Sequence, residues 1–144
     1  MKMDFINPKQ LAAPSGYNHG VAVTGGSLLF VAGQIGWDSQ SRIVGEKFAD
    51  QFALALENVV AVVREAGGEP RSIVRFLIFV TDKREYLDNL KAVGAAYRQV
   101  MGKHYPAMAL VEVKALVEDL AKVEIEAIAV IDTEKAGGEG AETK

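Results

Sequence analysis

The chain has 144 residues, of which 49% are hydrophobic and 24% are charged, a composition typical of one globular domain and not of a disordered chain. Its 16 Lys and Arg against 19 Asp and Glu give a formal net charge of −3. The basic surface that nucleic-acid binding requires is therefore absent, and no nucleic-acid partner is expected. The chain contains no cysteine, which excludes disulfides, thiolate catalysis and thiolate metal sites.

No apolar run approaches the ~18 residues that a membrane span requires. The first eight residues include Asp4 and Pro8, where a signal peptide would need a long apolar segment. The sequence therefore predicts a cytoplasmic protein with no membrane partner.

The first third of the chain predicts an arm followed by a hairpin. Residues 1–19 are interrupted by Pro8, Pro14 and Gly16, which favours irregular structure. Two β-rich runs, 21–24 and 28–35, flank a pair of glycines that is suited to a tight turn, so we predict that these runs pair with each other. Gly33 lies inside the second run and indicates a bulge or a close approach by another backbone or a ligand.

The rest of the chain alternates helices and strands. Apolar residues at spacings of three and four predict helices over 48–66 and 84–101, ended by Gly67 and Gly102. β-Branched and aromatic runs predict a buried strand over 72–80 and two further strands over 108–115 and 123–131.

The predicted order is β-β-α-β-α-β-β, an α+β fold with two helices on one face of a mixed β-sheet. We predict an N-terminal arm (1–19), a single domain (20–132) and a flexible C-terminal tail (133–144). Helices are available for only one sheet face, so the other face would need cover from association of several subunits.

Four segments carry a family resemblance: 15–17 (SGY), 30–36 (FVAGQIG), 105–113 (YPAMALVEV) and 123–130 (VEIEAIAV). In this order they resemble the RidA (YjgF, endoribonuclease L-PSP) family. The resemblance implies a chorismate-mutase-like fold and a homotrimer with clefts between subunits. It also implies hydrolysis of reactive enamines or imines, with no metal and no organic cofactor.

The resemblance also implies roles for individual residues. Glu124 matches the glutamate that orients or activates water, and Tyr17 and Gly33 match residues that line the pocket. Met108 stands where the deaminases have an arginine that binds the substrate carboxylate, and Leu110 stands where they often have a small polar residue or cysteine. A thioether cannot form the two parallel hydrogen bonds of a guanidinium. We therefore expect a small-molecule hydrolase with an altered substrate; the alternative is a non-catalytic trimer that binds a small metabolite or a partner.

Each of these residues also has a structural interpretation. Glu124 and Glu126 share a strand face, where they would suit acid/base work or pair with Lys or Arg at a wet subunit junction. Tyr17 could be a packing anchor, Gly33 a backbone requirement and Met108 an apolar filler.

Three other side chains are candidates for holding an anion in place of the absent arginine. Arg75 lies in the central strand, where an ion pair between subunits is the simpler role. Lys114 lies in the predicted strand 108–115, on the same face as Leu110 and Glu112. His104 precedes the segment around Met108 and could donate to an anion, although a lone histidine near a turn is usually solvated.

Overall fold

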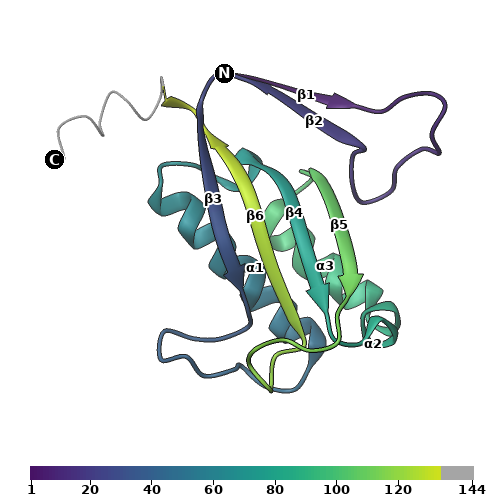
Figure 1. The fold of residues 1–144 in the computed structure, drawn as a ribbon, viewed down its shortest axis with the longest axis vertical. Coiled ribbons are helices and arrows are strands. Elements are labelled where there is room, and N and C mark those ends of the chain that lie inside the picture. The colour runs from purple at the N-terminus through teal and green to yellow at the C-terminus, as the bar shows by residue number, and fades with distance from the viewer. Residues whose placement is uncertain (134–144) are drawn as a thin grey trace, which may run out of the picture.

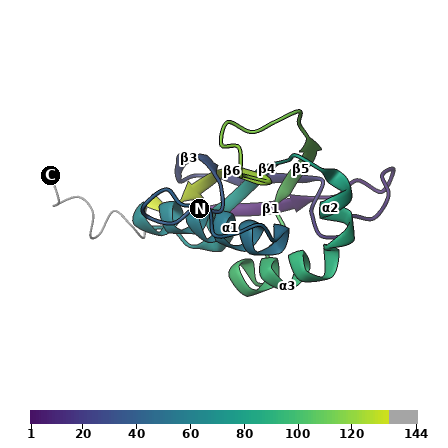
Figure 2. The ribbon, with the colours of Figure 1, turned by 90° about the horizontal axis from the view of Figure 1, so that it is seen from below.

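The computed structural model describes residues 1–133 and shows a mixed four-stranded sheet with the strand order β3-β6-β4-β5. β4 and β5 are parallel, and the other pairs are antiparallel. Helices α1 and α3 lie together on one face of this sheet (Figures 1 and 2). The predicted α+β fold, a mixed sheet with its helices on one face, is thereby confirmed. The strands are β3 (Ser27–Gln34), β4 (Ile73–Val80), β5 (Ala107–Glu112) and β6 (Val123–Ile131), and the helices are α1 (Phe48–Glu65) and α3 (Leu90–Met101).

The core lies between α1, α3 and the sheet. In β6, Val123, Ile125 and Ala127 alternate toward the helices and are almost completely buried, whereas Glu124 and Glu126 point to the opposite face. The apolar stripe of α1, which includes Leu56, Val59 and Val63, covers the buried side of β6 and β3. The apolar stripe that the residue spacing predicted for the first helix is thus confirmed as its buried side.

The predicted second helix is divided in two. α2 (Lys83–Asp88) begins at Asp82, whose side chain accepts hydrogen bonds from the Arg84 and Glu85 backbone amides. It ends at Asn89, where the side-chain amide donates to the Glu85 carbonyl at 2.7 Å and competes with the helical hydrogen bonds. A short 3-10 turn, η1 (Pro70–Ser72), precedes β4.

The N-terminal region differs from the sequence prediction. β2 (Gly20–Thr24) does not pair with β3; it pairs antiparallel with β1 (Lys2–Ile6), within the segment predicted to be irregular. Gly25 and Gly26 both have positive φ, as a hairpin turn would require, but the chain leaves them in a direction that carries β2 away from the sheet (Figure 1). Residues 2–6 provide a second strand edge for β2, which the composition of the arm did not reveal.

Three further findings concern the ends and edges of the fold. Within residues 1–133, no helix is long and apolar enough to span a membrane. Apart from Thr133, the predicted tail lies outside the described residues. The outer edge of β3 carries no strand partner in the described part of the chain.

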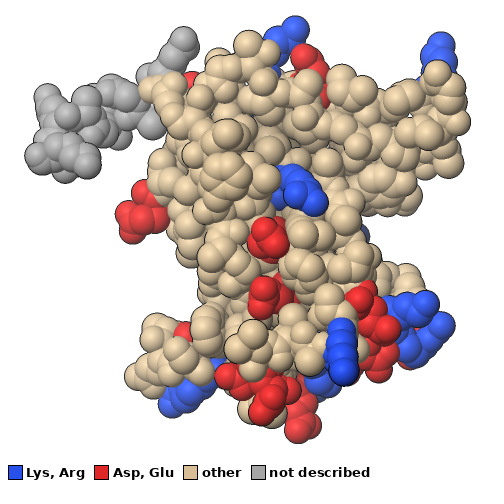
Figure 3. All heavy atoms as spheres, viewed as in Figure 1, with Lys and Arg blue, Asp and Glu red and all other residues tan. Residues whose placement is uncertain are grey.

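The sheet face turned away from the helices carries no covering layer in residues 1–133. We call it the open face; it is the side seen in Figures 1 and 3. It exposes large apolar side chains, with Phe30 at 70% and Leu28 at 66% exposed. A few charged groups lie among uncharged surroundings on this face (Figure 3). The alternation of the strands assigns its members: Leu28, Phe30, Arg75, Leu77, Phe79, Val111, Glu124, Glu126 and Ile128.

Candidate functional site

A groove of about 680 Å³ lies on the helix side of the sheet, between β5 and α3. Met108 and Leu110 project into it from alternate positions of β5, next to Phe76 and Ile78 of β4. The opposite wall is one face of α3, made by residues at helical spacing: Leu90, Val93, Gly94, Tyr97 and Arg98. The groove is therefore formed by an edge strand and by the helix that crosses behind it.

Five aromatic side chains line this groove: Tyr17, Phe52, Tyr86, Tyr97 and Tyr105. Tyr97 and Tyr105 stack with their ring centroids 5.2 Å apart and their planes 11° apart. The Tyr97 hydroxyl donates to the His104 carbonyl at 2.6 Å. Burial, with repulsion from Tyr105 as the smaller cause, raises the pKa of Tyr97 well above its usual value, so its hydroxyl remains a donor.

Tyr17 reaches the groove because its neighbour fastens the N-terminal loop to the start of β5. The backbone amide of Asn18 donates to the Pro106 carbonyl at 3.3 Å, and its side-chain amide donates to the Tyr105 carbonyl at 2.5 Å. Asn7 donates in turn to the Asn18 side-chain oxygen at 2.8 Å. A loop within the first twenty residues of the chain is thus held beside Met108, and the hydrogen bond from Asn18 to Tyr105 spans 87 positions of the sequence.

Gly33 and Glu124 meet on the open face. The register between β3 and β6 shifts between Val31 and Gln34, which places a bulge at Gly33 as the sequence predicted. A side chain at Gly33 would collide with the Glu124 carboxylate, so the glycine makes room for that group. The half-buried Glu124 carboxylate has no hydrogen-bond or ion-pair partner within residues 1–133. It is available to a ligand or to a neighbouring molecule.

The five residues expected at the site thus form two groups on opposite faces of the sheet. Tyr17, Met108 and Leu110 line the groove on the helix side, whereas Gly33 and Glu124 lie on the open face. The sheet separates the two groups within one chain. A site that contains both groups needs a second subunit.

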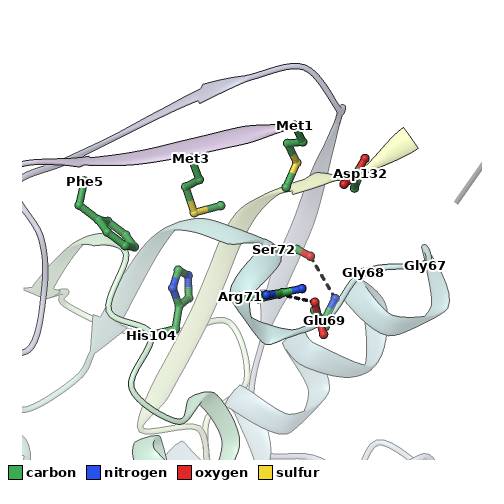
Figure 4. Close-up of a pocket in the computed structure, with 10 residues that line it drawn as sticks. All are labelled: Met1, Met3, Phe5, Gly67, Gly68, Glu69, Arg71, Ser72, His104 and Asp132. Atoms are coloured by element: carbon green, nitrogen blue, oxygen red, sulfur yellow. Dashed lines mark hydrogen bonds and ion pairs between the residues drawn. The ribbon is translucent and has the colours of Figure 1, made fainter. Parts of the chain in front are cut away.

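His104 lies outside the groove. Its Nε2 is 2.6 Å from the Ile73 carbonyl, which makes Nε2 the protonated nitrogen, and its ring lies 5.9 Å from that of Phe5. Figure 4 shows it in a second cavity, of about 460 Å³, beneath the β1 strand. Arg71 and Glu69, which also line this cavity, pair with each other. His104 therefore fastens β1 to the domain and is not placed to hold an anion at Met108.

The other cations weighed from sequence are also outside the groove. Arg75 lies on the open face of β4, and Lys114 lines a separate hollow beside the loop of residues 113–122. Within residues 1–133, no group of three or more His, Asp or Glu side chains is arranged to hold a metal ion.

Sequence reasoning missed Arg98, which lines the groove from α3. The signal was present: Arg98 lies four residues after Gly94 and one after Tyr97, on the helix stripe that faces β5. It went unnoticed because an exposed arginine near the end of an amphipathic helix usually belongs to the solvated face.

The fold and the groove agree with the comparisons to known proteins. Residues 8–131 match the family model described as Endoribonuclease L-PSP. The chain therefore belongs to this family, which is also called the Rid or YjgF family.

Individual relatives cover most of the chain. The 2-iminobutanoate/2-iminopropanoate deaminase of Salmonella typhimurium is 38% identical over 122 residues, which are 83% of this chain and 90% of that protein. The solved structure of the Rid-family protein YyfB from Yersinia pestis has a TM-score of 0.80 at 30% identity and covers 91% of this chain and all of that one. Escherichia coli TdcF, solved with bound serine, is 37% identical with a TM-score of 0.62, and the match covers 82% of this chain and 90% of TdcF.

Proposed function

We propose that this protein is a divergent, cofactor-independent hydrolase of enamines or imines, acting in clefts between the subunits of a homotrimer. The observation that carries the proposal is the half-buried Glu124 carboxylate, which has no partner within residues 1–133 and is fitted against Gly33 on a face whose other large side chains are mostly apolar. Relatives at 37–38% identity carry deaminase names, and one of them binds an amino acid.

The trimer is proposed because it would unite the two halves of the site. The open face exposes Phe30 and Leu28, which association would bury. In the proposed assembly, Gly33 and Glu124 of one subunit lie beside the groove of the next, which contributes Tyr17, Met108 and Leu110. Each cleft then contains an apolar wall, aromatic side chains and one carboxylate.

The proposed reaction adds water to the carbon of a protonated imine. Glu124 takes a proton from the water as its oxygen bonds to that carbon, and the C=N π electrons move to nitrogen. The protonated Glu124 then gives its proton to nitrogen. As the carboxylate takes the proton of the adduct's hydroxyl group, the O–H electrons form the C=O bond and the C–N bond breaks, which releases ammonia and leaves the carbonyl compound. An enamine first tautomerises to the imine. No atom of the protein becomes bonded to the substrate.

Met108 is proposed to stand in the place of the carboxylate-binding arginine of the deaminases. Loss of a buried bidentate ion pair costs on the order of 2–5 kcal/mol, which corresponds to a reduction in rate of up to a few thousandfold. Short 2-imino acids should therefore be poor substrates of the unmodified protein.

The test is ammonia release from freshly generated 2-aminoacrylate and 2-iminobutyrate, measured with a coupled assay. We expect slow turnover by the wild type, faster turnover by Met108→Arg and none by Glu124→Gln. Glu126→Gln is the matched control, because Glu126 lies two residues along the same face. Equal activity of the wild type and an arginine-bearing relative would contradict the altered substrate, and full activity of Glu124→Gln would contradict the catalytic role.

The second candidate function is a non-catalytic trimer that binds an apolar metabolite. It is favoured by the side chains of Met108 and Leu110, which make the floor of the groove apolar. In that case Glu124→Gln would leave ligand affinity intact, and no variant would release ammonia.

A further inference from the structure

Among the residues that line the groove between β5 and α3, Arg98 is the only charged one. The other lining residues are aromatic, aliphatic, glycine or serine, so the groove holds one positive charge and no negative one within the described residues. A ligand bound there would meet an apolar, aromatic surface and a single guanidinium.

The guanidinium is not engaged elsewhere. Within residues 1–133, Arg98 has no hydrogen bond or ion pair from its side chain. Its side chain folds back along α3 toward Gly94, where an added Cβ would lie 3.3 Å from Nη1. The missing side chain at Gly94 thus leaves space for the guanidinium over a residue that itself lines the groove.

Arg98 and Met108 line the same groove. Met108 is the register partner of Phe76, and the Phe76 ring lies 6.3 Å from that of Tyr97, the residue before Arg98. The cation and the apolar position on β5 therefore line one groove from its two walls, α3 and β5.

We propose that Arg98 is the anion-binding residue of this groove and that it selects carboxylate compounds with an aromatic or bulky apolar body. A planar guanidinium binds a carboxylate through parallel charge-assisted hydrogen bonds, and the stacked Tyr97 and Tyr105 rings provide the surface for an apolar body. The inference rests on the proposed function in taking this groove as the ligand site. It adds the substrate class, which is an acid whose carboxylate is bound by Arg98 of α3 and not by a residue of β5.

The test compares phenylacetate with its neutral counterpart phenylacetamide by isothermal titration calorimetry on the full chain. We expect the wild type to bind the acid more tightly than the amide. Arg98→Gln should weaken binding of the acid by about tenfold, the usual size for an accessible charged hydrogen bond, and leave the amide unchanged. Because the guanidinium is exposed, added salt should weaken the binding of phenylacetate and leave the binding of phenylacetamide unchanged.

Arg64→Gln is the matched control, since Arg64 is an exposed arginine near the end of α1 and does not line the groove. Unchanged acid affinity in Arg98→Gln, an equal loss in Arg64→Gln, or no binding of the acid to the wild type at millimolar concentration would each overturn the proposal. The ammonia assay separates the two proposals. If Arg98→Gln has a reduced affinity for phenylacetate and no variant releases ammonia, only the hydrolase proposal fails. If Glu124-dependent turnover is found and Arg98→Gln binds phenylacetate as tightly as the wild type, only the Arg98 proposal fails.

Discussion

Gly33 of β3 and Glu124 of β6 are fitted to each other across the bulge, and a side chain at position 33 would occupy the space of the carboxylate. The absence of a side chain at position 33 is therefore needed for the position of the Glu124 carboxylate. Gly33 is needed because of its neighbour and not because of a left-handed backbone, since it does not have a positive φ.

Gly33→Ala should therefore affect the carboxylate more than the fold. The three atoms nearest to the added Cβ all belong to the flexible Glu124 side chain, which can rotate away. We therefore expect a free energy of unfolding within ~1 kcal/mol of the wild type and a strong loss of any Glu124-dependent activity. Gly36→Ala is the contrasting variant, because its Cβ would lie 2.7 Å from the Cα of Gln51 in α1. Its free energy of unfolding, measured with urea, should be lower than that of the wild type by about 1–3 kcal/mol. Equal stability losses in the two variants would contradict this distinction.

Gln51 should be a main determinant of the loop that precedes β6. Its side chain is fully buried, donates to the Gly45 and Leu120 carbonyls at 2.7 and 3.1 Å, and accepts from the Lys122 amide at 2.8 Å. Gln51→Leu leaves these backbone groups without partners, so we expect a loss of about 2–4 kcal/mol in urea unfolding. Gln99→Leu, at an exposed position of α3, should change stability by less than ~0.5 kcal/mol. Similar effects of the two substitutions would rule out this role for Gln51.

Tyr97 should make stability depend on alkaline pH. Its pKa is raised in the folded protein, first by burial, above the value of 10.0 expected when unfolded. The unfolded chain therefore ionises first, and the stabilising contribution of Tyr97 is complete below pH 10 and falls as the pH rises above it. Tyr97→Phe loses the hydrogen bond to the His104 carbonyl, so at pH 7 it should be less stable by about 1 kcal/mol.

Urea unfolding of the wild type and Tyr97→Phe at pH 7 and pH 11 measures this difference. The difference in free energy of unfolding between the wild type and Tyr97→Phe should be smaller at pH 11 than at pH 7, or change sign. Tyr86, whose pKa burial also raises, is present in both proteins and cancels in the comparison. A gap of the same size at both pH values would show that Tyr97 does not titrate differently in the two states.

The open face should determine the oligomeric state. Phe30 is 70% exposed in the single chain, so Phe30→Asp should not disturb the fold. Burying a phenylalanine contributes about 1.5–3 kcal/mol, and an aspartate in its place would also have to lose its hydration at the interface. We expect a trimer for the wild type and a folded monomer for Phe30→Asp in light-scattering chromatography. Leu87→Asp, on α2 and away from this face, should remain trimeric; a monomeric wild type would refute the proposed assembly.

The sequence by itself determined the local character of several elements. The apolar spacing in 48–66 assigned the buried stripe of α1, and the two-residue spacing of Glu124 and Glu126 placed them on one strand face. A bulge, one of the two interpretations of Gly33, was also confirmed, whereas its contact with the Glu124 side chain was not predicted. These properties are local, because a strand or helix has a fixed period and the boundary between its faces follows from its own residues.

Only the tertiary structure decided which elements meet. β2 pairs with β1 and not with β3, because two strand edges were available and the flexible Gly25-Gly26 pair permits either course. The same holds for the candidate site, since Met108 and Glu124 lie on opposite faces of the sheet and Arg98 reaches the groove from α3. Such relationships depend on the relative placement of distant segments, and no local period in the sequence records that placement.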